Sequence, residues 1–162
     1  MRMAAILAVI LALMLGTVAE AKSSKATVTG IYTYFVGGDP AMVRTLSVSA
    51  EGTDHAKGTW TWARPSGTYT GPVTCLRVSG ADAWFAGSAP GTGVEPITAV
   101  FFWVHDGGTP GKSAGDLGFS WAADPGETLD TMEGLCKSMS TSFYGNEPFS
   151  LVAGDVTVTP GK

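Results

Sequence analysis

Charged residues are scarce in this chain. Asp, Glu, Lys and Arg together make up 15% of its 162 residues, and the formal net charge is −4. The few lysines and arginines are scattered along the sequence and form no basic run. Nucleic acids and anionic membrane surfaces bind through clustered Lys and Arg side chains. We therefore expect neither of them as a partner.

Patterns that signal zinc binding, phosphate binding or nucleophilic catalysis are also missing. His55 and His105 are the only histidines, and no His or Cys pair has the spacing of a zinc site. Pro110-Gly111-Lys112-Ser113 lacks the upstream glycine of a phosphate-binding loop. No cluster of catalytic side chains is visible. These absences predict a non-enzymatic protein without a cofactor.

The longest apolar run lies at the N-terminus. Arg2 precedes an almost unbroken apolar stretch from Ala4 to Val18, and Ala19-Glu20-Ala21 follows with the small-x-small pattern that signal peptidase recognises. The alternative, an uncleaved membrane anchor, requires a span of about 20 residues. We predict a signal peptide at residues 1–21, a single secreted domain at residues 22–162, and no membrane span after cleavage.

The chain has only two cysteines, Cys75 and Cys136. In an exported protein such a pair indicates one disulfide bond, although a free nucleophilic cysteine is the alternative. Closing a loop of about 60 residues would stabilise the fold by roughly 4 kcal/mol.

Turn residues divide the remaining chain into short segments with alternating apolar residues, the pattern of β-strands that are half buried. This pattern predicts an all-β fold, an antiparallel barrel or sandwich of about eight strands. A switch in the alternation predicts a bulge near Pro72 or Cys75. The expected strands lie at residues 26–36, 42–50, 57–63, 68–79, 82–87, 97–105, 117–121 and 149–159.

One of these strands, at residues 97–105, is apolar on both faces, whereas antiparallel strands commonly keep one face in water. It must be covered on both sides or form an oligomer interface. The irregular excursion at residues 122–148 offers a cover, because residues 128–139 contain apolar side chains at helical spacing. The predicted disulfide would hold this excursion, a potential lid, against the fourth strand.

Three segments, in a fixed order between Thr68 and Thr159, carry a family resemblance. They are Val73–Gly80 (VTCLRVSG), residues 104–111 (VHDGGTPG) running on to Asp116, and Gly154–Val158 (GDVTV). They resemble the V-x-C-L-x-V-x-G strand, the D-x-G-x-P-G turn and the terminal strand of an uncharacterised family of small secreted bacterial proteins of the actinomycete type. The resemblance implies a secreted β-rich domain and supplies no catalytic residues.

Seven aromatic residues are candidates for a ligand pocket, because a barrel of eight strands is wide enough for one small ligand. The alternative is that they simply fill the interior. The seven are Trp60, Trp62, Tyr69, Phe101, Trp103, Phe119 and Trp121.

Asp106 and Asp116, with Asp155 as a further candidate, are candidates for calcium ligands around the glycine-rich turn. The alternative is that they accept hydrogen bonds from that turn. Taken together, the sequence predicts a secreted, non-enzymatic domain that is structural or binds a protein or ligand. The other hypothesis is a calycin-like carrier of a small hydrophobic ligand. The partner is then a small hydrophobic molecule or another extracytoplasmic protein.

Overall fold

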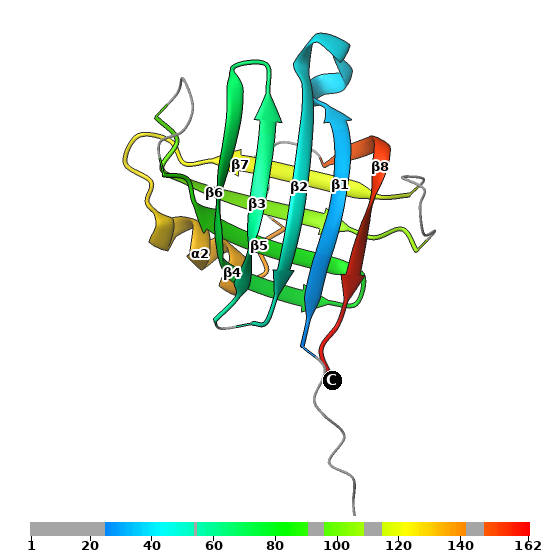
Figure 1. Ribbon diagram of the computed structural model, residues 1–162, viewed down its shortest axis with the longest axis vertical. Coiled ribbons are helices and arrows are strands. Elements are labelled where there is room, and N and C mark those ends of the chain that lie inside the picture. Colours follow the sequence, from blue (N-terminus) through cyan, green and yellow to red (C-terminus); the bar gives the residue numbers. More distant parts are fainter. Residues whose placement is uncertain (1–24, 54, 91–95, 109–114, 142–147) are drawn as a thin grey trace, which may run out of the picture.

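The computed structural model describes residues 25–53, 55–90, 96–108, 115–141 and 148–162. Eight antiparallel strands, each paired with the next along the chain, form a barrel that closes where β8 pairs with β1 (Figure 1). This confirms the all-β prediction and selects the barrel over the sandwich. The strands are β1 (Thr27–Phe35), β2 (Val43–Glu51), β3 (Lys57–Arg64), β4 (Gly67–Ser79), β5 (Asp82–Ser88), β6 (Ala99–His105), β7 (Leu117–Ala122) and β8 (Phe149–Thr159).

The barrel is flattened into two layers whose strands cross at a steep angle (Figure 1). The long strand β4 passes from one layer to the other. Its first part, up to Pro72, pairs with β3, and its second part, from Val73, pairs with β5. The register shifts between Val73 and Cys75, as the predicted bulge requires. At this corner Gly71 approaches its neighbour so closely that a Cβ atom would lie 1.9 Å from the carbonyl oxygen of Ser88.

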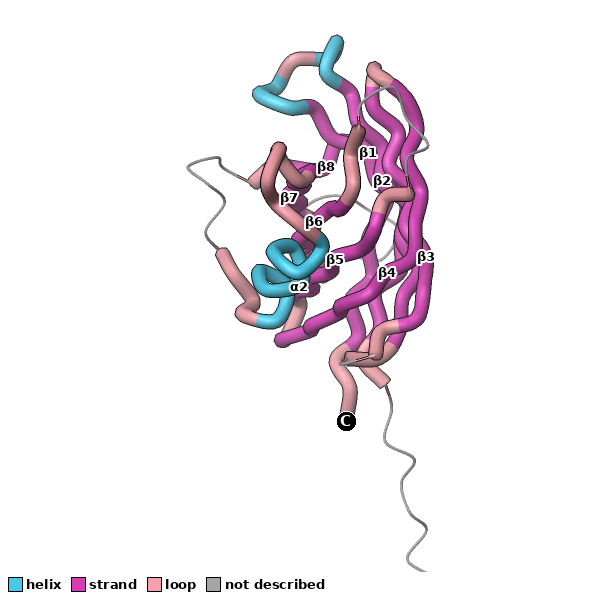
Figure 2. Tube along the Cα trace, turned by 90° about the vertical axis from the view of Figure 1, so that its left-hand side faces the viewer, coloured by secondary structure: helices cyan, strands magenta, loops and turns pink. Residues whose placement is uncertain are grey.

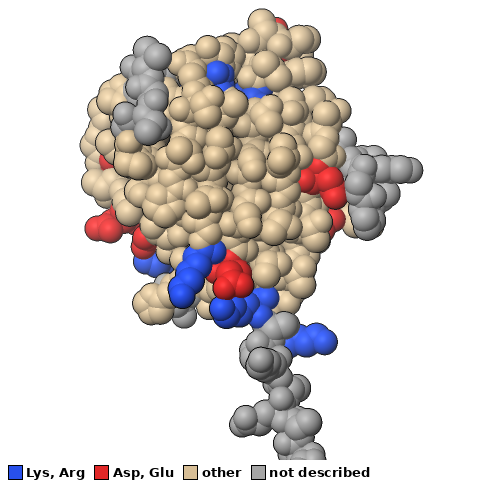
Figure 3. Space-filling view, in the orientation of Figure 1, with Lys and Arg blue, Asp and Glu red and all other residues tan. Residues whose placement is uncertain are grey.

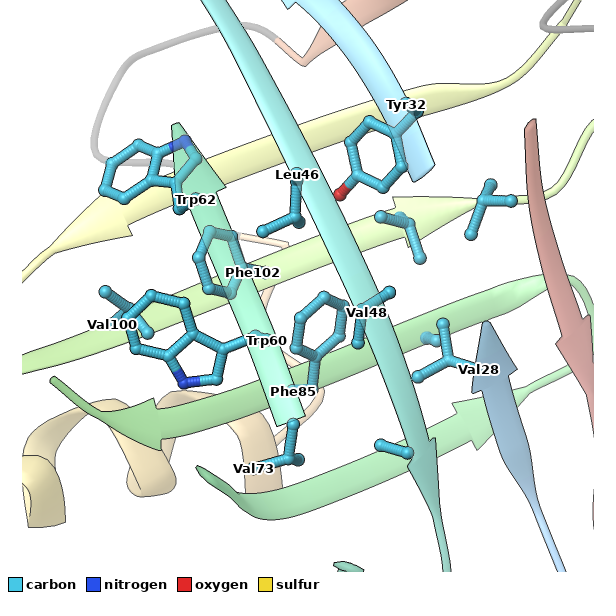
Figure 4. Close-up of a cluster of buried hydrophobic side chains, with 14 of the residues drawn as sticks. Val28, Tyr32, Leu46, Val48, Trp60, Trp62, Val73, Phe85, Val100 and Phe102 are labelled. Carbon is cyan, nitrogen blue, oxygen red and sulfur yellow. The ribbon is translucent and has the colours of Figure 1, made fainter. Parts of the chain in front are cut away.

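Large side chains fill the space between the two layers. Phe102 of β6 lies at the centre, with ring centroids 5.7 Å from Trp60, 5.6 Å from Trp62 and 5.1 Å from Phe85 (Figure 4). All four side chains are at most 1% exposed. The middle of the barrel is therefore a packed core, so a ligand would have to bind in another part of the protein.

Strand β6 is covered on both faces, as its double apolar pattern predicts. Six of its seven residues are buried. The side chains of one face belong to the barrel core, and those of the other face lie beneath the helix α2 (Leu129–Lys137), which packs against the outside of β4, β5 and β6 (Figure 2). The predicted excursion thus supplies the cover. Residues 142–147 of that excursion lie outside the described residues.

Local sequence explains where α2 begins and what it buries. Thr128 caps the helix through a reciprocal pair of hydrogen bonds with Thr131. Met132 and Cys136 are four residues apart, so they lie on one face of the helix, and both are fully buried. Cys136 forms the predicted disulfide with Cys75 of β4.

The outer face of β1, β2 and β3 carries few charged side chains (Figure 3). Hydroxyl groups on neighbouring strands contact each other there, Thr33 with Thr45 at 3.0 Å and Thr61 with Thr70 at 3.2 Å. Among the described residues, no helix has the length and apolar character needed to cross a membrane. The predicted signal peptide, residues 1–21, lies outside the described part of the chain.

Candidate functional site

A pocket of about 230 Å³ opens at one end of the barrel, beside β7. Within the described residues, β7 pairs with β8 at only two positions, Leu117 and Gly118, so the rest of β7 has no strand neighbour on that side. The pocket lies along this part of β7 and the facing ends of β1, β2, β3 and β8. Its lining comprises Val36, Arg44, Trp62, Arg64, Phe119, Ser120, Trp121, Ala122, Asp124 and Phe149.

Two arginines converge on one aromatic ring in this pocket. The guanidinium carbon of Arg44 lies 5.2 Å from the centroid of the Trp62 ring, and that of Arg64 lies 4.7 Å from it. Both distances are within the range of cation–π attraction. Stacking on a buried ring limits how far each guanidinium can move, so both positive charges are held at the pocket.

A buried hydrogen-bond network supports the same wall. The hydroxyl of Tyr34 donates to Oγ of Ser120 at 2.7 Å and accepts from Nε1 of Trp62 at 3.0 Å. Burial raises the pKa of Tyr34 above its ordinary value, and this outweighs the opposing effects of the Ser120 hydrogen bond and the nearby Arg44 charge. Tyr34 is therefore a neutral phenol at physiological pH and fixes the orientation of Trp62.

Aromatic rings form the apolar side of the pocket. The ring of Phe149 stacks on Tyr34 at 5.1 Å, with an angle of 8° between the planes. Phe149 and Phe119 are nearly parallel at 6.4 Å, and so are Phe119 and Trp121. These rings come from β1, β7 and β8, so they also link β7 to β8, whose backbone pairing is sparse within the described residues.

The rim next to β7 is held by one carboxylate. Oε2 of Glu127 accepts from Nε1 of Trp121 at 2.9 Å and from the backbone N–H of Asp124 at 2.8 Å. The loop between β7 and α2 is thereby tied to the indole that lines the pocket. The site consists of preorganised walls rather than loose side chains.

We predict different effects on stability for removal of two neighbouring buried hydroxyls. Tyr34→Phe leaves the buried Trp62 N–H without its acceptor and should lower the free energy of unfolding by about 1–3 kcal/mol at pH 7. The hydroxyl of Tyr32 is buried and makes no hydrogen bond within the described part of the chain. Tyr32→Phe should therefore change stability by less than about 0.5 kcal/mol or increase it. Urea unfolding of both variants measures the difference, and an equal loss in both would contradict the network.

Burial also raises the pKa of Tyr32, well above the ordinary value of 10.0, with a smaller contribution from neighbouring Tyr34. Both folded-state pKa values exceed the unfolded value, so the folded state holds these protons more tightly than the unfolded state. Stability is therefore independent of these two groups below about pH 9 and falls as the pH rises above 10, where the unfolded chain can ionise them. The same urea series at pH 8–11 should show this alkaline decline. Tyr32→Phe should reduce the slope of the free energy of unfolding against pH by up to about 1.4 kcal/mol per pH unit. An unchanged slope in this variant would show that other groups cause the decline.

The seven aromatic residues predicted to line a pocket fall into three groups. The lining of the pocket contains Trp62, Phe119 and Trp121, but Phe119 also belongs to the cluster beneath α2 and Trp121 packs against that cluster. Two others belong to the barrel core and are absent from that lining, Trp60 and Tyr69, and the Tyr69 ring lies 5.8 Å from the guanidinium carbon of Arg64. The remaining two lie on the outer side of β6, in the cluster beneath α2, Phe101 and Trp103. Alternation along β6 separates these last two from the interior, because successive side chains of a strand point to opposite faces.

Asp106 and Asp116, the calcium candidates, bind backbone N–H groups at the seam with β8. Each accepts one N–H from the turn after β6 at 2.7 Å. Each also accepts one from β8, at 3.0 Å for Asp106 and 3.4 Å for Asp116. All four carboxylate oxygens are thus hydrogen-bonded, and the two side chains take the place of a strand partner, which this part of β8 lacks on that side among the described residues. Asp155 lies on β8 opposite Ile31, and residues 109–114 of the turn lie outside the described residues.

Sequence reasoning missed the arginines and Tyr34, although a signal for them exists. In β2, Arg44 has the same parity as Leu46, which points into the barrel. In β3, Arg64 has the same parity as Trp62. A charged residue in the inward register near the end of a strand marks the mouth of a barrel, because water reaches the interior only there.

The site combines two fixed cations, a buried neutral phenol and a small apolar pocket. Among the residues that the structure describes, no group of three or more His, Cys, Asp or Glu side chains is placed to hold a metal ion. This arrangement is suited to holding a small molecule by shape and charge. Comparison of the chain with family models, with curated proteins and with solved structures found no match.

Proposed function

We propose that this protein is a non-enzymatic, extracytoplasmic binding protein that holds a small molecule with an apolar body in the pocket at the barrel mouth. The observation that carries the proposal is the convergence of polar groups on a pocket with rigid aromatic walls, which is the usual composition of a ligand site. Because the core is packed, we propose that the ligand of the carrier hypothesis binds at the end of the barrel and not at its centre.

The location outside the cytoplasm rests on two features. The buried Cys75–Cys136 disulfide is of a kind that persists in oxidising compartments. The apolar N-terminal segment has the pattern of a signal peptide. The resemblance to a secreted bacterial family agrees with both, and we propose membership of that family on the three motifs already described.

The five tryptophans provide a direct test, because each indole N–H donates a hydrogen bond in a different place. With ¹⁵N-labelled tryptophan, the oxidised protein should give five indole signals, which single Trp→Phe variants assign. A panel of small planar and aliphatic compounds should shift the signals of Trp62 and Trp121. The signals of Trp60, Trp84 and Trp103 should stay in place.

A blocked pocket supplies the control. Ala122 lines the pocket, so Ala122→Phe should fill it and abolish the shifts. Ala153→Phe, on the exposed part of β8, should leave them unchanged. Shifts confined to Trp84 and Trp103 would place binding under α2 instead. If no compound shifts any signal, the proposal is wrong and the function must be sought on the outer surface.

A further inference from the structure

We infer that the pocket selects a small carboxylate with a planar apolar body, and that Arg44 and Arg64 together bind the carboxylate. This inference rests on the proposed function and names the chemical class of its ligand. It requires that the two arginines approach each other at the pocket, that the walls suit a flat apolar group, and that the charge of the lining favours an anion.

The strand register brings the two arginines together. Thr45 of β2 is the partner of Ala63 of β3, so the next positions along these antiparallel strands, Arg44 and Arg64, are neighbours at the barrel mouth. Both guanidinium groups stack on the same Trp62 ring. Like charges on adjacent strands repel each other, and an anion bound between them would relieve that repulsion. Guanidinium groups are planar donors that match a carboxylate in a bidentate geometry.

The shape and size of the pocket define the rest of the ligand. Phe149, Phe119 and Trp121 line the pocket and have nearly parallel rings, with interplanar angles of 12° and 10° between successive members, and Phe119 and Trp121 also pack in the cluster beneath α2. A cavity of about 150 Å³ accommodates benzene. The 230 Å³ of this pocket therefore suits one ring together with a carboxylate. A flat apolar body gains contact with the rings that line the pocket.

The charge of the lining is unlike that of the whole chain. The protein carries a net charge of −4, yet the charged residues of the pocket are two arginines and one acid, Asp124, which is exposed at the rim. Two of the four arginines of the chain lie in this one pocket. In an acidic protein, a local excess of positive charge favours an anionic ligand over a neutral or cationic one.

The test uses a pair of probes that differ in charge but not in shape. 4-Fluorobenzoate and the neutral 4-fluorobenzamide are titrated into the oxidised protein and followed by ¹⁹F NMR and by the indole signal of Trp62. We expect saturable binding of the benzoate and binding of the amide that is weaker by about tenfold or more. Arg44→Gln and Arg64→Gln should each weaken benzoate binding by a similar factor and weaken amide binding by a clearly smaller factor.

Arg77→Gln is the matched control, because Arg77 lies on β4 outside the pocket lining. It should leave both affinities unchanged, and thermal unfolding of all three variants confirms that they are folded. Equal binding of benzoate and amide, with no effect of the arginine substitutions, would overturn the carboxylate inference while the binding function stands. Failure of the benzoate to bind at millimolar concentration would also overturn it. The wider compound panel then decides separately whether the pocket binds anything.

Discussion

Removal of the Cys75–Cys136 disulfide by Cys75→Ala and Cys136→Ala together should lower the free energy of unfolding by about 4 kcal/mol. The bond closes a loop with a sequence separation of 61 residues, and the unfolded chain regains the corresponding freedom when the bond is absent. Urea unfolding of the double variant and of the oxidised protein measures the difference. A loss of less than about 1 kcal/mol would show that α2 stays docked without the bond and that the unfolded chain gains little freedom.

The same variant should also loosen α2 locally. The indole N–H of Trp84 donates to the backbone oxygen of Ser140, at 3.0 Å, just beyond the end of the helix. If the disulfide holds this segment against the barrel, the Trp84 indole proton should exchange with solvent faster in the double variant. The indole proton of Trp60, bonded to Pro72 inside the barrel, is the internal control and should keep its exchange rate relative to global unfolding.

Truncation of either Phe101 or Phe102 to alanine should lower the free energy of unfolding by about 3–5 kcal/mol, although the two side chains lie on opposite faces of β6. Both side chains are at most 1% exposed, Phe102 in the barrel core and Phe101 in the cluster beneath α2. Chemical unfolding of Phe101→Ala and Phe102→Ala measures these costs. Ile31→Ala is the control on an uncovered outer face, since Ile31 is 63% exposed, and should cost less than about 0.5 kcal/mol.

Combining these substitutions with loss of the disulfide distinguishes the two clusters. Phe101 shares its cluster with Cys136, so the effect of Phe101→Ala should be partly lost when the disulfide is already absent. Phe102 belongs to the other cluster, and its effect should be additive with that of the disulfide. Equal behaviour of the two phenylalanines would mean that α2 does not contribute a separate core.

The positions of the strands in the sequence follow closely from local patterns. Alternating residues predict β2 and β3 to within one residue of their observed ends, because the two faces of a half-buried strand meet different environments. The helical spacing of Met132 and Cys136 likewise predicts α2, and the Thr128 cap fixes where it begins. In each case the signal lies within the segment itself, so no knowledge of distant residues is needed.

The candidate site is different, because its parts are far apart in the sequence. Arg44, Trp62 and Phe149 come from three strands, and nothing local indicates that they meet. The aromatic residues illustrate the same limit. A count of rings predicts a pocket of seven, but only the closed barrel separates Phe101, beneath α2, from Trp62 at the mouth.

By itself, the sequence determined the β-rich composition, the positions of the strands, the helical segment and the disulfide. Alternation and helical spacing act over short distances, and a single pair of cysteines leaves one possible disulfide. Only the tertiary structure decided that the layers close into a barrel, that the interior is packed, and that the pocket lies beside β7. The physical reason is that these properties depend on strand register and closure, which bring together side chains from both ends of the chain and decide which of them water can still reach.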